Sequence, residues 1–383
     1  MSVPDLTLTG ADVLRPDGVE TAAALSLAQG QIADGPAGRQ VDLSGYMILP
    51  GIVDIHGDGF ERHLAPRRGA MKDIDHGLIA AEAELAANGI STAVLAQFYS
   101  WEGGMRGPEF AERVFAGVAK IRDDVVTDLH MQLRFETSML NFYEEIAGFV
   151  ARHDVAYMVF NDHLPHEALA RGKTPPGLVG KALRIGCNPD KHLAMMQDMH
   201  ARMGEVPGAV AGLVARLLMQ GVRMGSHDDR DAAGRAVWRD MGVRIAEFPE
   251  TPEAIEAARA NGDPVIMGAP NVVRGGSHKG NVSAAEMVIM GQVDALASDY
   301  HYPSLRRAAF LMTDSGVADL ATAWALISKG PARVLGLTDR GEIAPGLRAD
   351  LLIMDPGTRR VAATFAGGRI SYMTGEVAAR FAG

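Results

Sequence analysis

The sequence feature that most constrains the fold is the segment 49–59, LPGIVDIHGDG, in which a short apolar run ends in two potential metal ligands. Residues 52–55 are apolar apart from Asp54, and glycines bound the run on both sides. This pattern predicts a buried parallel strand. Because side chains two residues apart in a strand share a face, His56 and Asp58 can meet just beyond its end, where they would suit a divalent metal such as zinc. The pair could also simply mark where a strand leaves the core. The residues at the ends of the later strands must distinguish this alternative from a metal site.

The same strand-then-helix pattern recurs through the middle of the chain. Helices are predicted over 74–87 and about 107–121, and seven more apolar runs are predicted strands. These strands cover residues 89–96, 129–136, 156–163, 222–227, 243–248, 264–269 and 294–299. Eight strands within about 290 residues predict a (β/α)8 barrel in which 164–220 contains a long insertion. An open doubly wound sheet is the alternative, but no glycine fingerprint follows the first strand.

Both ends of the chain are predicted to be rich in β-strands. Residues 1–50 contain short alternating runs separated by turns, without helical periodicity. Residues 341–383 contain a turn followed by apolar strands. We therefore expect 1–50 and 341–383 to form one small sheet domain, and 51–340 to form the catalytic barrel.

The composition is typical of a globular enzyme and excludes several other classes. Of 383 residues, 47% are hydrophobic and 22% are charged, and the net charge is -10. Such a surface repels nucleic acid and acidic membranes, so an anionic substrate would need a local cationic pocket. The single cysteine rules out an intrachain disulfide framework. We see no apolar run near the ~20 residues of a membrane helix and no signal sequence, so we expect a cytoplasmic enzyme.

Six ionisable side chains lie at the carboxyl ends of the predicted strands, which is the active-site face of such a barrel. They are His56, Asp58, Glu136, His163, His227 and Asp299. A lone histidine there is more often a hydrogen-bonded structural residue, but burying several ionisable groups in one mouth is costly unless they are paired or bind metal. Their number exceeds what one tetrahedral zinc needs and suits two divalent ions. Glu136 is the expected bridging carboxylate and Asp299 the expected general base, although Asp299 could be a ligand only.

A glycine-rich, cationic loop follows the seventh predicted strand. It contains Arg274, Gly275, Gly276, Ser277, His278 and Lys279. Glycines let backbone N–H groups approach an anion, and the start of the next helix favours negative charge. Arg274 and Lys279 can bind phosphate oxygens, and His278 can protonate a leaving phosphate. Arg67 and Arg68 form a second cationic group, and either group could instead be a solvated surface.

Two motifs resemble the amidohydrolase superfamily. They are the LPGxxDxH stretch before the barrel and GxIxPGxxADL at 341–351. The resemblance implies a metal-dependent (β/α)8 barrel with a small β-sandwich built from both termini. The superfamily usually has His-x-His where this chain has His56-x-Asp58. Further segments that resemble one branch of the superfamily are spread over almost the whole chain, and residues 267–281 are the longest of them. Together these features resemble one branch of the superfamily, the diphosphatases of phosphonate metabolism.

This resemblance implies the release of diphosphate from a small anionic substrate, a ribose 5-triphosphate. It maps the six strand-end residues onto metal positions, for which zinc is the first expectation and iron or manganese are alternatives. Most of the superfamily places the bridging group and two histidines on strands four, five and six, whereas the predicted strands give three, four and five. Two other functions stay open: a C–N hydrolase, such as a deacetylase or deaminase, and a noncatalytic scaffold subunit. A homodimer is also possible.

Overall fold

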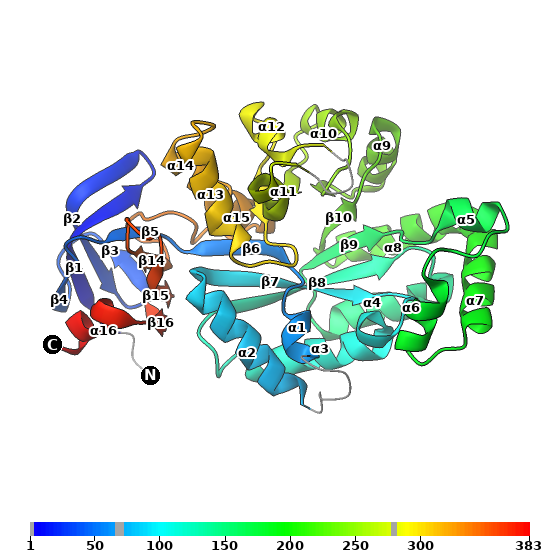
Figure 1. Cartoon of the computed structure of the whole chain (residues 1–383), viewed down its shortest axis with the longest axis horizontal. Helices are drawn as coiled ribbons and strands as arrows, with labels where there is room; N and C mark the ends of the chain where they lie inside the picture. Colours follow the sequence, from blue (N-terminus) through cyan, green and yellow to red (C-terminus); the bar gives the residue numbers. More distant parts are fainter. Residues whose placement is uncertain (1–3, 66–72, 277–281) are drawn as a thin grey trace.

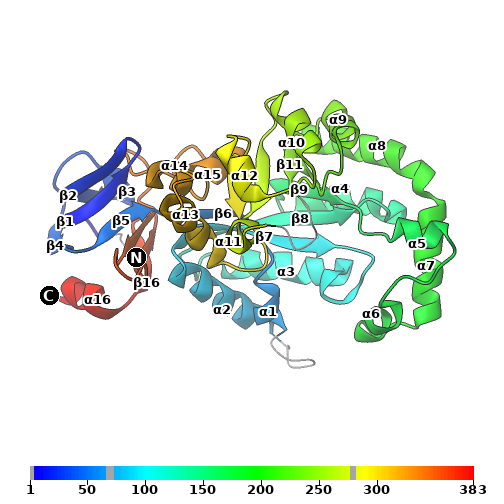
Figure 2. The same ribbon diagram turned by 45° about the horizontal axis from the view of Figure 1, so that its top comes forward.

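The structure is a computed structural model that describes residues 4–65, 73–276 and 282–383 (Figure 1). Within these ranges the strands form two separate sheets of eight strands each. In both views the sheet from the chain termini lies at one end of the molecule, and the helices labelled α5 to α7 lie at the opposite end (Figure 1, Figure 2).

The larger sheet is parallel throughout, and its strands follow one another in chain order. They are β6 (Ile52–Gly57), β7 (Ile90–Tyr99), β8 (Asp128–Glu136), β9 (Tyr157–Asn161), β10 (Arg223–His227), β11 (Ile245–Glu247), β12 (Val265–Gly268) and β13 (Ala295–Ala297). A bridge between Gly57 and Asp299 connects the end of the first strand to the residues after the last one. The sheet therefore closes nearly completely into a barrel, and the predicted (β/α)8 fold is confirmed.

Helices cover the outside of this barrel and also form the insertion between β9 and β10. The α-helices of the described residues are α1 (Glu61–Leu64), α2 (Ile74–Ala87), α3 (Pro108–Ile121), α4 (Tyr143–Arg152), α5 (His166–Ala170), α6 (Leu178–Arg184), α7 (Pro189–Ala201), α8 (Val206–Met219), α9 (Ala232–Met241), α10 (Pro252–Arg259), α11 (Ala269–Arg274), α12 (Ala284–Ile289), α13 (Ser304–Asp314), α14 (Leu320–Ala325), α15 (Lys329–Leu335) and α16 (Gly375–Ala382). The two predicted helices are α2 and α3, and α5 to α8 form the predicted long insertion.

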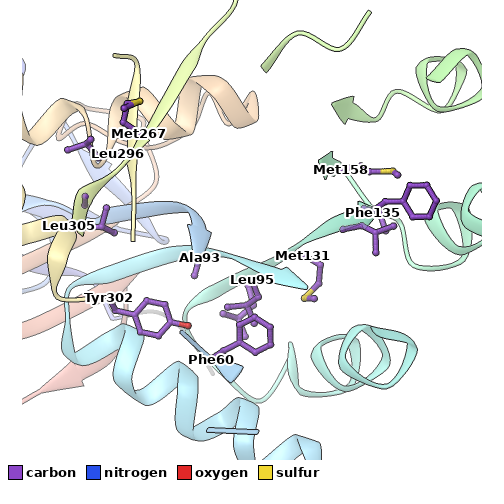
Figure 3. Close-up of a cluster of buried hydrophobic side chains, with 14 of the residues drawn as sticks. Phe60, Ala93, Leu95, Met131, Phe135, Met158, Met267, Leu296, Tyr302 and Leu305 are labelled. Carbon is purple, nitrogen blue, oxygen red and sulfur yellow. The ribbon is translucent and has the colours of Figure 1, made fainter. Parts of the chain in front are cut away.

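Alternation of side chains along β8 shows how the barrel is filled. Leu129, Leu133 and their odd-numbered neighbours pack in the large core between the strands and the helices. Figure 3 shows part of this layer, including Phe60, Met131 and Phe135. Because successive side chains of a strand point to opposite faces, the even-numbered residues of β8 point into the barrel. These inward residues are His130, Gln132, Arg134 and Glu136. The interior is therefore polar above a small apolar cluster of inward residues from the other strands.

The second sheet contains strands from both ends of the chain. Its strands are β1 (Leu6–Arg15), β2 (Gly18–Ala28), β3 (Gln31–Ala33), β4 (Arg39–Asp42), β5 (Met47–Pro50), β14 (Leu351–Met354), β15 (Val361–Ala366) and β16 (Arg369–Met373). The two ends meet where β5 pairs antiparallel with β14, with Leu49 opposite Leu352. A hydrophobic cluster that includes Leu8, Ile353 and Phe365 gives this sheet its own core. The predicted separate sheet from both termini is thus confirmed.

Within the described ranges, none of the helices has the length and apolar character that crossing a bilayer would require.

Candidate active site

The carboxyl ends of the barrel strands bring four of the six predicted metal ligands together. Ligand atoms of His56, Asp58 and Asp299, from the first and last strands, lie within 4.8 Å of one another. Ligand atoms of His56, His227 and Glu247 satisfy the same limit. The site therefore consists of two triads that share the fully buried imidazole of His56.

Glu247, at the end of β11, is a site residue that the sequence analysis missed. Its Oε1 atom lies 2.8 Å from His56 Nδ1. Its Oε2 atom accepts hydrogen bonds from Gln132 Nε2 at 2.9 Å and from the Tyr157 hydroxyl at 2.7 Å. Burial alone would raise the pKa of Glu247, but His56, His227 and the Tyr157 hydroxyl lower it to about 2. Glu247 is therefore a buried, ionised carboxylate of the second triad. The available signal was an acidic residue at the end of the sixth predicted strand.

Glu136 and His163 lie beside the triads and contact each other. Glu136 Oε2 accepts a hydrogen bond from the backbone N–H of His163 at 3.0 Å, and Oε1 contacts the His163 imidazole. The His163 ring centre is 6.3 Å from that of His227. Among the described residues, neither Glu136 nor His163 belongs to a triad. The bridging role predicted for Glu136 stays a prediction, and in this structure both of its oxygens contact His163.

Glu136, His163 and His227 lie at the ends of the third, fourth and fifth barrel strands, as the sequence predicted, and not at those of the fourth, fifth and sixth. Glu136 ends β8, the third strand of the barrel, and His163 follows β9, the fourth. His227 ends β10, the fifth strand. No barrel strand was overlooked within the described residues, and the sixth strand, β11, contributes Glu247 instead of a histidine.

Asp299 links the last strand of the barrel to the first. Its backbone N–H donates to the His56 carbonyl at 3.0 Å, and its carbonyl accepts from the backbone N–H of Asp58 at 2.9 Å. Burial and the nearby charge of Asp58 raise the pKa of Asp299 to about 6, although His56 and Arg134 act in the opposite direction. A carboxyl group that titrates this close to neutrality suits general acid–base chemistry.

Three residues just after the strands adopt left-handed backbone conformations. The φ angles are 59° at Asp228, 52° at Phe248 and 55° at Asp299. Such angles are uncommon outside glycine, and at a bulky phenylalanine they indicate local strain of the kind found at functional sites. The Phe248 ring packs edge-on, 5.0 Å from the His56 ring and 5.1 Å from the His227 ring. These turns therefore help to orient both imidazoles.

Arg134 is a second residue that the sequence analysis missed. It is 4% exposed, and its guanidinium lies 3.8 Å from the centre of the Phe98 ring. Its Nη2 atom is 3.1 Å from His227 Nε2, and Nη1 is 3.4 Å from His56 Nε2 and 3.6 Å from Asp58 Oδ2. A charged residue at an alternate position of the third predicted strand was the available signal.

A cavity of about 250 Å³ opens over the triads, and we name it the cationic cavity after its three arginines. Its walls include the side chains of Arg106, Arg134 and Arg274, together with those of Asp58, Asp228 and Asp299. Since the whole chain carries a net charge of -10, this concentration of arginines is a local feature of the mouth. A pocket of this kind can bind an anionic group directly beside the ligand atoms.

The predicted glycine-rich loop is only partly described. Arg274 lies on the cavity wall, Gly275 has a left-handed φ of 74°, and Gly276 follows it. Ser277, His278, Lys279, Arg67 and Arg68 lie outside the described residues. We predicted that the loop follows the seventh strand directly. The structure differs, because α11 lies between β12 and Gly275. Arg274 is therefore the last residue of a helix.

A second cavity of about 600 Å³ shares the walls formed by His163, His227 and Asp228. Phe160 and Trp238 line it and stack with their ring centres 5.2 Å apart. Its other lining residues include Met203, Val206, Val210 and Met241, the carboxylates of Asp162, Asp229, Asp231 and Glu250, and one cation, Arg230. The triads thus lie between a cationic cavity and a cavity that is apolar and acidic.

The donor set of the triads fits a divalent cation. Two imidazoles and several carboxylates converge in a buried position, which is the mixed nitrogen and oxygen environment that zinc and related ions accept. Such a concentration of acidic groups also needs compensating positive charge, because uncompensated buried carboxylates are costly. The candidate site is therefore a divalent metal centre.

Comparison with known proteins supports this fold and identifies a relative in sequence. No protein-family model matches the chain. The chain is 32% identical to the alpha-D-ribose 1-methylphosphonate 5-triphosphate diphosphatase of Escherichia coli (strain K12) over 324 residues. This alignment covers 82% of this chain and 84% of that protein.

Three solved structures share the fold. An N-acetyl-D-glucosamine-6-phosphate deacetylase mutant from Mycobacterium smegmatis aligns over 97% of this chain and 100% of its own, with a TM-score of 0.64 and 15% identity. A beta-aspartyl dipeptidase from Fervidobacterium islandicum AW-1 aligns over 97% and 98%, with a TM-score of 0.63 and 13% identity. An adenosine deaminase from Xanthomonas campestris with bound zinc aligns over 99% and 96%, with a TM-score of 0.56 and 15% identity.

The barrel, the terminal sheet and the strand-end ligands define a hydrolase of the amidohydrolase superfamily with a site for divalent metal. Within that superfamily, the chain belongs to the family of the alpha-D-ribose 1-methylphosphonate 5-triphosphate diphosphatase.

Proposed function

We propose that this protein hydrolyses alpha-D-ribose 1-methylphosphonate 5-triphosphate and releases diphosphate. The supporting observation is that the triads open directly into a cavity lined by Arg106, Arg134 and Arg274. Arginine forks match phosphate oxygens geometrically and retain their charge at any physiological pH. The named activity of the Escherichia coli relative supports the same substrate.

The charges of the two cavities favour one orientation of such a substrate. The triphosphate carries several negative charges and would be attracted by the arginines of the cationic cavity. The second cavity is lined by Asp162, Asp229 and Glu250, which would repel it. We therefore place the triphosphate over the triads in the cationic cavity.

The residues of the site suit hydrolysis of a phosphoanhydride. A divalent ion held by ligands from the two triads would polarise a phosphoryl oxygen and lower the pKa of water there. Asp299 would accept a proton from the attacking water, because the pKa of its carboxyl group is raised to about 6. Water would add to the α-phosphorus. The bond between the α-phosphorus and the oxygen that joins it to the β-phosphorus would break, and diphosphate would leave. Arg134 and Arg274 would stabilise the charge that develops on the phosphoryl oxygens.

The second candidate function is hydrolysis of a C–N bond. The apolar and acidic cavity beside His163 and His227 favours it, since that cavity could hold an uncharged or cationic substrate. An amide substrate would not require the arginines of the other cavity. The same Asp299 would then transfer a proton to the leaving nitrogen.

The test uses the purified protein loaded with zinc, iron or manganese in parallel. We expect diphosphate release from alpha-D-ribose 1-methylphosphonate 5-triphosphate, and no ammonia or acetate from a panel of amides and amines. In ¹⁸O-labelled water the label should enter the ribose phosphate product, because attack occurs at the α-phosphorus. Label in diphosphate would place the attack at the β-phosphorus instead. No release of diphosphate, or release of ammonia or acetate alone, would refute the proposal.

The variant Arg274→Gln tests the cationic cavity. It removes one positive charge of the cavity wall and leaves the residues of both triads unchanged. We expect it to raise KM for the triphosphate by about tenfold or more, since hydrogen bonds to charged groups contribute about 1.5–3 kcal/mol. If the substrate were an amide, the same change would leave KM unaltered.

A further inference from the structure

Arg134 is directed into the metal centre by the alternation of β8. Its neighbours Leu133 and Phe135 pack outward against the helices, so the side chain between them points into the barrel. There it is 4% exposed. A buried guanidinium at this position is a permanent positive charge, because arginine does not lose its proton in proteins.

The contacts of Arg134 resemble those of a bound cation. Its Nη2 and Nη1 atoms approach the Nε2 atoms of His227 and His56 at 3.1 and 3.4 Å. Because a guanidinium only donates hydrogen bonds, a His227 Nε2 atom that bonds to it would accept, and that imidazole would carry its proton on Nδ1. The Nδ1 atoms of His56 and His227 lie 2.8 Å from Glu247 Oε1 and 3.1 Å from Asp228 Oδ2. The ring nitrogens that would hold a divalent ion on this side therefore already face a cation.

The surroundings of Arg134 oppose its displacement. The Phe98 ring lies against its guanidinium at 3.8 Å, and the guanidinium of Arg106 lies against the same ring at 4.2 Å. A shift of Arg134 toward the mouth would lose this cation–π contact and bring it closer to a second positive charge. Asp58, with Oδ2 3.6 Å from Nη1, attracts it into the centre.

We propose that Arg134 takes the place of one of the two divalent ions that the ligand set suggests, so that the protein binds one divalent ion per chain. This inference rests on the metal centre and not on the identity of the substrate. It replaces the expectation of two ions, which counted carboxylates and imidazoles without the guanidinium between them. The fixed charge would also remain available to phosphoryl oxygens when the divalent ion is lost.

The test measures metal stoichiometry rather than activity. Metal-free protein is reloaded with zinc or cobalt, excess metal is removed by gel filtration, and bound metal is measured by mass spectrometry. We expect one ion per chain in the natural protein and two in Arg134→Gln, which vacates the position. The matched control Arg106→Gln removes the other guanidinium that contacts the Phe98 ring and should still bind one ion.

A spectroscopic measurement distinguishes where the ions bind. Cobalt-loaded Arg134→Gln should show magnetic coupling between two neighbouring ions in its electron paramagnetic resonance spectrum, whereas the natural protein should show an isolated ion. Two coupled ions in the natural protein, or a single ion in a folded Arg134→Gln, would overturn the proposal. If Arg134→Gln does not fold, the stoichiometry and spectrum of the natural protein decide alone. Failure of this proposal would leave the diphosphate-release test unaffected.

Discussion

At the scale of single residues, Glu247 connects three strands of the barrel to its own strand β11. Its carboxylate contacts His56 on β6, Gln132 on β8 and Tyr157 on β9. Groups that fix the orientation of metal ligands in this way typically change metal affinity 10–100-fold when they are removed. Glu247 also lies 2.8 Å from Nδ1 of the fully buried His56 ring, so its loss would leave that ring nitrogen without this carboxylate partner.

The change Glu247→Gln keeps the shape of the side chain and removes its charge. We expect the affinity for zinc to fall by roughly 10–100-fold, measured by competition with a chelator of known affinity. The matched control is Glu136→Gln, an equally buried carboxylate outside both triads, which should reduce the affinity much less. Equal losses in the two variants would contradict the roles assigned to these carboxylates.

The change Asp299→Asn separates a general base from a metal ligand. If Asp299 accepts the proton of water, kcat should fall by about 10²–10⁴-fold while bound metal is retained. If Asp299 is only a ligand, the bound metal should be lost together with activity. Parallel measurement of kcat and metal content in one preparation therefore assigns its role. If the natural protein held no bound metal and Asp299→Asn changed nothing measurable, the noncatalytic alternative would be favoured.

At the scale of elements, the sequence predicts strands and helices better than it predicts the centre between them. β6 to β13 were recognisable because each is a short apolar run, and α2 because its apolar residues recur with helical spacing. The helix α11 was missed because it has only six residues and is followed by Gly275. The position of Arg134 depends on closure of the barrel, which brings β6, β8 and β10 to one point.

A buried arginine on α9 holds the end of the strand that carries His227. Arg235 is 1% exposed and donates to Ser226 Oγ at 2.6 Å and to the Ile245 carbonyl at 3.3 Å, while pairing with Asp229. These partners lie beside His227 on β10 and the following turn, and on β11. The helix therefore positions the metal centre through one side chain.

We expect Arg235→Met to destabilise the protein by about 3–5 kcal/mol, because it leaves the buried Asp229 carboxylate without its cation. Urea denaturation measures this loss. The control Arg239→Met, on the same helix, removes a partner of Asp263 that also contacts Arg235, so its effect should be smaller. If both variants unfolded at the same urea concentration, Arg235 would have no special role in supporting β10.

At the scale of the whole molecule, a small ion cluster joins the barrel to the segment that leads to the terminal sheet. Asp128, the first residue of β8, accepts from Arg340 Nη1 at 2.5 Å and from Arg348 Nη1 at 3.1 Å. Arg340 also donates to Thr92 Oγ1 on β7 at 2.9 Å. These contacts lie at the opposite ends of the strands from the metal centre, where barrel residues contribute to stability rather than to chemistry.

This cluster predicts a loss of stability in acid. Burial alone would raise the pKa of Asp128, but His130 and Arg340 lower it far below its ordinary value. The carboxylate therefore stabilises the fold fully above the unfolded pKa of about 4, and that contribution decreases as the pH falls below it. We expect Asp128→Asn to lower the free energy of unfolding by about 1–3 kcal/mol at pH 7 and to flatten its dependence between pH 4 and 2.

Thermal and urea denaturation between pH 2 and 7 would measure this effect. The control is Asp314→Asn, which removes an exposed ion pair with Arg359 and should change neither the stability at pH 7 nor its acid dependence. An unchanged acid profile in Asp128→Asn would show that the cluster contributes little to the folded state.

The left-handed turns at Asp228, Phe248 and Asp299 have a consequence for laboratory evolution of this protein. Glycine would adopt these angles without strain, so selection for heat resistance alone is expected to favour it there. Glycine at Asp228 or Phe248 would free the backbone beside a candidate metal ligand, and glycine at Asp299 would remove a candidate ligand itself, so each replacement is expected to slow turnover. Libraries aimed at robustness should therefore conserve these three positions and vary the terminal sheet, which lies at one end of the molecule (Figure 1).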